Sequence, residues 1–136
     1  MKAEKNLDLQ CAECGRDIAG EGKVSQALVN SALAVLLEQG VYAMFLFLCS
    51  RGNKDKKAAK KMRERLYQLL ARVLKKDENT SAASAEKEVL LQNVRENFVQ
   101  DMETAYLTKD IAEQALIYAR YHVKAREKNK TAGEQE

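Results

Sequence analysis

The chain contains no proline, and it has only six glycines among 136 residues. Proline interrupts helices and glycine weakens them, so their scarcity favours helix over turn-rich folds. Aromatic residues make up 6% of the chain, and β-branched and aromatic residues are thin outside one short segment, which argues against a sheet. Good helix formers, namely Ala, Leu, Glu, Lys, Gln and Arg, dominate. We therefore expect one all-α domain with a single core.

Long apolar runs and an even number of cysteines are also lacking. The longest apolar run, Val41–Cys49, has nine residues, whereas a membrane-spanning helix needs about 20. Residues 1–20 are too polar for a secretory signal. Three cysteines, an odd number, suit a reducing compartment. The sequence thus predicts a cytoplasmic protein without a membrane partner.

Groups for catalysis and metal binding are sparse. His122 is the only histidine, and no glycine-rich phosphate loop is present, so we expect neither an enzyme nor a cofactor. Cys11 and Cys14 form a C-x-x-C pair. Zinc usually takes four ligands, and Cys49 and His122 would have to supply the rest. The favoured alternative is that both cysteines pack as small apolar residues, so no metal site is predicted.

Apolar spacing indicates a compact bundle of about five helices within residues 1–128, of which 1–20 form the N-terminal helix. The expected helices cover residues 3–18, 25–50, 53–76, 85–102 and 109–128, with a loop at 77–85 and a disordered tail at 129–136. Ser25 is the expected N-cap of the second helix, and the last is expected to start after Thr108, with Asp110 in its first turn. Val41–Cys49 is apolar on every side, which predicts one central buried helix. Gly40, just before it, either kinks or divides the second helix.

The third helix concentrates positive charge. Residues 51–76 carry eleven Lys and Arg against Asp55 and Glu64, a local net charge of +9. On a helical wheel the basic residues lie opposite an apolar face, over roughly 30 Å at 1.5 Å per residue. The candidate nucleic-acid contacts there are Lys57, Lys60, Lys61, Arg65, Arg72 and Lys75. Lysines in a first turn oppose the helix dipole, which favours a polyanion-binding surface over a merely solvated face.

The last helix supplies a second candidate surface. Ile117 and Tyr121 are expected on its outside, beside Arg120 and Lys124. Exposed apolar and aromatic residues next to cations are typical of a partner surface or of base stacking. We expect Ile117 and Tyr121 to bind a partner and Arg120 and Lys124 to contact nucleic acid. The alternative is a bundle edge covered by the N-terminal helix.

Two segments carry a family resemblance. Residues 39–48, QGVYAMFLFL, followed by the basic helix, and residues 110–128, DIAEQALIYARYHVKAREK, resemble the small helical subunit of type III CRISPR effector complexes, nearer the Cmr branch than the Csm branch. The resemblance spans roughly residues 24–128. It implies a non-catalytic subunit that stacks in several copies beside guide and target RNA. It also implies that the basic helix touches the RNA backbone without reading sequence, while other subunits are its protein partners.

Two further functions stay open at this point. One is a helical interaction module or homodimer with no nucleic-acid role, whose basic helix docks on an acidic protein. The other is a small metal-binding regulator built on the C-x-x-C pair.

Overall fold

The computed structural model describes residues 6–20, 24–75 and 86–135, with side chains described as far as Glu127. These residues contain no strand, which confirms the all-α prediction. The elements in chain order are α1 (Leu7–Ala19), α2 (Gln26–Gln39), α3 (Val41–Cys49), a 3-10 turn η1 (Asn53–Asp55), α4 (Lys56–Val73), α6 (Lys87–Asn97) and α7 (Met102–Gln135). The described part thus holds six α-helices rather than about five. The predicted loop at 77–85 lies outside the described residues.

Side-chain caps explain where α1 and α2 begin. Asn6 Oδ1 accepts a hydrogen bond from Leu9 N at 2.8 Å, and Ser25 Oγ accepts one from Leu28 N at 3.1 Å. Each cap satisfies an amide that has no partner inside its helix. Ser25 was the expected cap, but the first helix begins at Leu7 rather than near residue 3.

Gly40 divides the second predicted helix into α2 and α3. Its φ of 100° and ψ of −176° lie in a region that essentially only glycine adopts. The Gly40 amide still donates to Leu36 O at 2.9 Å, and its carbonyl accepts from Met44 N at 3.1 Å. One glycine therefore closes α2 and opens α3, which is a break and not a kink.

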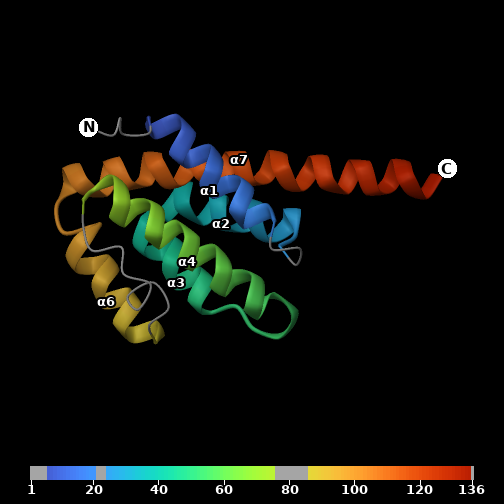
Figure 1. Cartoon of the computed structure of the whole chain (residues 1–136). Coiled ribbons are helices and arrows are strands. Elements are labelled where there is room, and N and C mark those ends of the chain that lie inside the picture. Colours follow the sequence, from blue (N-terminus) through green and yellow to red (C-terminus); the bar gives the residue numbers. More distant parts are fainter. Residues whose placement is uncertain (1–5, 21–23, 76–85, 136) are drawn as a thin grey trace.

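The last helix is longer than predicted. Asp101 Oδ1 accepts a hydrogen bond from Thr104 N at 2.8 Å, so the cap precedes Met102 and not Lys109. Thr108, the expected start, lies inside α7, where its buried hydroxyl is 3.1 Å from Phe98 O and 3.0 Å from Thr104 O. α7 also continues to Gln135, past the expected end at residue 128, because no proline or left-handed residue stops it. Figure 1 shows its C-terminal part reaching beyond the other helices.

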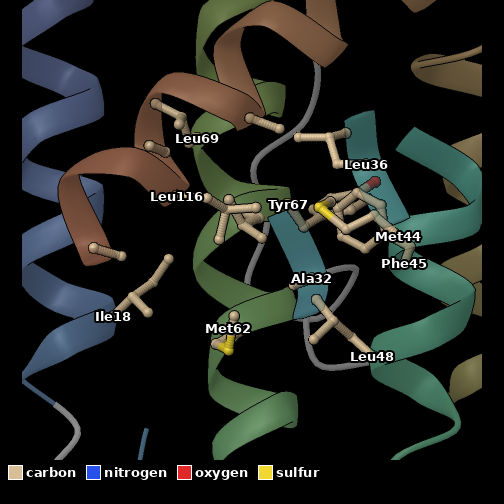
Figure 2. Close-up of a cluster of buried hydrophobic side chains, with 14 of the residues drawn as sticks. Ile18, Ala32, Leu36, Met44, Phe45, Leu48, Met62, Tyr67, Leu69 and Leu116 are labelled. Carbon is tan, nitrogen blue, oxygen red and sulfur yellow. The ribbon is translucent and has the colours of Figure 1, made fainter. Parts of the chain in front are cut away.

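The core lies between α4, which packs against α1, α3 and α7, and α2, which packs against α3 and α7. Figure 2 shows Met62 and Leu69 of α4 among side chains from these helices. α3 is not buried on every side: Val41, Met44, Phe45, Leu48 and Cys49 are buried, but Leu46 is 48% exposed. The prediction of a fully enclosed central helix was therefore too strong. A helix of nine residues at the bundle surface still keeps one side in solvent. No helix in the described ranges is long and apolar enough to span a bilayer.

α1 packs closely across α7 (Figure 1). Gly15 is buried at the crossing, and an added Cβ would lie 2.6 Å from Tyr118 Cβ and 2.7 Å from Ala119 N. Tyr118 also donates a hydrogen bond to Asp8 Oδ1 at 2.6 Å. Arg126 binds the carbonyl of Ala19 and, at 2.9 Å, that of Val24. These contacts hold α1 on α7, and α1 also packs against α4.

Candidate nucleic-acid interface

α4 separates its buried and exposed residues as the sequence predicted. Ala58, Ala59, Met62, Leu66, Leu69 and Leu70 are buried, and Val73 is partly buried. Two polar residues are buried with them: Tyr67, whose ring lies 5.0 Å from that of Phe98, and Arg63, which is 7% exposed. The amphipathic pattern places most of the remaining cations outside.

The cations at the N-terminal end of α4 form what we call the lysine patch: Lys54, Lys56, Lys57, Lys60 and Lys61. All five side chains are exposed. In the part of the chain that the structure describes, no carboxylate lies within the 4 Å of an ion pair with any of them. Lys54 precedes the helix in η1, and Lys56 opens α4; neither was among the predicted contacts. Among the described residues, five ammonium groups without a carboxylate partner therefore gather near the N-terminal end of α4.

Arg65 and Arg72 have different surroundings. They line a groove of about 270 Å³ between α4 and α1, together with Gln68 and Leu69 of α4 and with Glu13, Cys14 and Asp17 of α1. Cys14 Sγ lies 3.6 Å from Arg65 O, which holds the two helices together here. Arg65 is only partly exposed, whereas Arg72 is exposed. The predicted basic face is thus interrupted by acidic residues of another helix.

Lys75 lies beyond the end of α4. The helix stops at Val73, and Lys75 has a φ of 58°, in the left-handed region that closes helices. Its side chain is exposed. Lys75 therefore does not continue the helical row that joins Lys57 to Arg72.

The second predicted surface, on α7, is only partly exposed. Tyr121 is 60% exposed, and the Arg120 guanidinium carbon lies 5.8 Å from the centre of its ring. Lys124 is exposed, but Ile117 is partly buried and packs against the core. Ile117 is thus less exposed than its expected place on the outside of the helix, and its role in binding a partner stays a prediction. The two predicted sets of cations lie on different helices, one on α4 and one on α7, and α1 packs against both of these helices.

The cysteines behave as packed thiols. Cys11, Cys14 and Cys49 are all buried and reduced. Cys11 Sγ lies 3.7 Å from Ile111 O of α7, whereas Cys14 points to α4. Burial raises the pKa of the Cys11 thiol to about 11, with Asp8 adding to the rise, and burial raises that of Cys14 to about 12. Thiols that stay protonated at neutral pH are poor nucleophiles and poor metal ligands.

Two further features of the described residues bear on a chemical site. Within the described residues, no three His, Cys, Asp or Glu side chains are grouped to hold a metal. A second groove, of about 380 Å³, is lined by Glu38, Gln39, Gly40, Val41 and Tyr42 at the α2–α3 junction and by Val99, Ala105, Tyr106 and Lys109 opposite. His122 is exposed.

Sequence reasoning missed that Glu13 and Asp17 line the groove beside the arginines of α4. Their i, i+4 spacing puts both on one side of α1, and Cys14 between them marks that side as close to the core. That signal was present in the sequence. It did not reveal which helix lies opposite.

Comparison with known proteins finds no matching family model, no matching curated protein and no matching solved structure.

Proposed function

We propose that this chain is a non-catalytic RNA-binding subunit that holds the phosphate backbone through the lysine patch. The observation that carries the proposal is the group of five exposed lysines without a carboxylate partner among the described residues. Unpaired cations cost stability through mutual repulsion, so a surface that keeps them suits an anionic ligand. Backbone contacts of this kind position a nucleic acid without reading its sequence.

The geometry favours a polymer over a small anion. Neither of the two grooves described above is lined by a lysine of the patch. The sequence also has no glycine-rich loop of the kind that cradles the phosphates of a mononucleotide. Lysines spaced along a helix instead match repeated phosphates. Non-specific binding of this type has a Kd on the order of 10⁻⁴–10⁻⁶ M at physiological salt. Such weak binding becomes effective when several copies share one strand.

The specific setting that we propose is an RNA-guided effector complex of the type III CRISPR class, to which two segments of the sequence bear a resemblance. In that setting several copies would line a guide–target duplex, and other subunits would carry out cleavage. Sedimentation of the chain with RNA duplexes of increasing length tests this part. The number of bound copies should rise with duplex length, and a fixed stoichiometry of one would contradict it.

The direct test is fluorescence anisotropy of a labelled RNA duplex with the purified chain at about 50 and 200 mM salt. The variant Lys57→Gln, Lys61→Gln removes two cations one turn apart. Each lost phosphate contact should reduce the salt slope, that is, the slope of log K against log salt concentration, by roughly 0.7 to 1. The variant should therefore bind more weakly and with less salt dependence.

A matched control removes two lysines elsewhere. Lys87→Gln, Lys109→Gln changes the net charge equally, with one substitution on α6 and one on α7. The control should keep the wild-type salt slope. Equal loss in both variants would mean that only net charge matters, and no binding at 50 mM salt would overturn the proposal.

A second candidate function is a helical module that binds an acidic protein. It is favoured by Met102 and Tyr106, which are 71% and 61% exposed about one turn apart on α7. Exposed apolar groups of this size suit a protein contact. Competition separates the two functions. RNA of unrelated sequence should displace labelled RNA that is bound through its phosphate backbone, and it should not displace a shape-matched protein partner.

A further inference from the structure

The groove between α1 and α4 places two carboxylates opposite two guanidinium groups. Glu13 and Asp17 line it from α1, and Arg65 and Arg72 line it from α4. The two acids and two bases cancel in formal charge. The lysine patch, by contrast, has only Asp55 and Glu64 nearby in sequence, and both are partly buried. The two halves of α4 therefore present different fields to a polyanion.

We infer that Glu13 and Asp17 screen Arg65 and Arg72 from nucleic acid, so that backbone contacts are confined to the lysine patch. This inference rests on the proposed function and deepens it by fixing how much of α4 is used. α1 then acts as an acidic boundary to the RNA path.

The physical reason is repulsion combined with competition. A phosphate that entered the groove to reach Arg65 would approach Glu13 and Asp17, which line the same groove, and the negative charges would repel each other. The arginines would also have to exchange neighbouring carboxylates for phosphate, which returns little net free energy. Asp17 keeps its negative charge available here, because its ion pair with Arg16, at 3.7 Å, is exposed and weak.

The electrostatics around Cys14 agree with this arrangement. Burial is the largest cause of the raised pKa of the Cys14 thiol; Cys11 and the charged Asp17 raise it further, whereas the charges of Arg72 and Arg65 lower it. All three charges are thus close enough to act on one atom between the helices. α1 cannot easily move away, because Arg126 and the Gly15 crossing hold it on α7.

The test is a double-mutant cycle on the full chain, read as the salt slope of RNA binding. The first variant, Glu13→Gln, Asp17→Asn, removes both screening carboxylates and should make Arg65 and Arg72 available to phosphate. Two added contacts steepen the slope by roughly 1.8, which is about a tenfold larger loss of affinity between 50 and 200 mM salt. Each single substitution should give part of that change.

The second variant, Arg65→Gln, Arg72→Gln, should change the wild-type Kd by less than about twofold, since screened cations contribute little. In the Glu13→Gln, Asp17→Asn background the same change should remove the gained affinity and the added slope. A control for net charge is Glu38→Gln, Glu103→Gln, which neutralises two exposed acids on other helices. It should give a smaller gain without a steeper slope. Circular dichroism should show the same helix content throughout.

Two results would overturn the inference while leaving the proposed function standing. One is that Arg65→Gln, Arg72→Gln weakens wild-type binding as much as Lys57→Gln, Lys61→Gln. The other is that Glu13→Gln, Asp17→Asn behaves no differently from the Glu38→Gln, Glu103→Gln control. If the wild type fails to bind at 50 mM salt, or binds equally after Lys57→Gln, Lys61→Gln, the proposed function falls and the inference falls with it.

Discussion

Replacing Gly15 by alanine tests the helix crossing on which the site geometry depends. The added Cβ would lie 2.6 Å from Tyr118 Cβ, 2.7 Å from Ala119 N and 2.9 Å from Ala115 O. Two of these atoms belong to the α7 backbone and the third is fixed to it. None is the end of a flexible side chain, so the clash can be relieved only if α1 and α7 move apart.

The expected magnitude follows from two opposing terms. Overpacking of a core contact costs roughly 1–3 kcal/mol, and occasionally more. Alanine in a helix interior gains up to about 1 kcal/mol over glycine. The net loss should be about 1–2 kcal/mol. For a domain of this size it corresponds to a fall in Tm of roughly 3–10 °C.

Thermal and urea unfolding followed by circular dichroism measure this difference. Gly52→Ala is the matched control, because Gly52 has an extended φ of −136° and nothing within 4 Å of an added Cβ. The control should leave Tm within about 2 °C of the wild type, as surface substitutions usually do. A higher Tm for Gly15→Ala, as expected for an ordinary helical glycine, would refute the close crossing.

Three further predictions concern stability. Gly40→Ala should lower the free energy of unfolding by about 1–3 kcal/mol, because its φ of 100° strains any other residue although the space is open; urea unfolding beside the same control checks this. The buried thiols Cys11 and Cys14 have native pKa values of about 11 and 12, above the 9.0 of a free thiol. Above pH 9 the thiols of the unfolded chain ionise while the buried thiols stay protonated, so the free energy of unfolding should fall between pH 9 and 11. It should fall less in a Cys14→Ala variant. Urea unfolding across that pH range measures the fall, and an unchanged free energy of unfolding would contradict the burial. Arg126→Gln should cost about 1.5–3 kcal/mol, since two backbone carbonyls lose a charged donor; hydrogen exchange should then speed up in α1, and unchanged exchange would contradict this role.

Part of this fold was accessible from the sequence because its signals are local. The apolar row from Ala58 to Leu70 predicts the buried side of α4 from helical periodicity alone. Ser25 predicts a helix start because its side chain and the amide three residues on belong to one turn. Lys57, Lys60 and Lys61 of the lysine patch were also accessible, since solvent exposure follows once the apolar side of the helix is known.

The missed features depend on contacts between distant residues. Gly15 reads as an ordinary helical glycine until α7 is placed against it. Arg65 and Arg72 lie on the outer side of α4, and only the position of α1 shows that Glu13 and Asp17 face them. Sequence periodicity assigns a side chain to the outside of its own helix. It does not tell which other helix covers that outside.

The start of α7 was missed for another reason. The prediction placed the start of the last helix after Thr108, with Asp110 in the first turn, and did not consider Asp101 as a cap. Tertiary packing favours Asp101: the Thr108 hydroxyl is buried at the turn between α6 and α7, 3.1 Å from Phe98 O. A threonine buried in this way bonds back to its own helix instead of capping a new one.

The most direct measurement of the central claim is the salt slope of RNA binding by the wild type and by Lys57→Gln, Lys61→Gln, with Lys87→Gln, Lys109→Gln as control. We predict binding at about 50 mM salt, and a slope that falls by roughly 0.7 to 1 per lysine in the first variant only. Undetectable binding at that salt, or equal slopes in all three proteins, would contradict the assignment of the lysine patch as a phosphate-backbone surface.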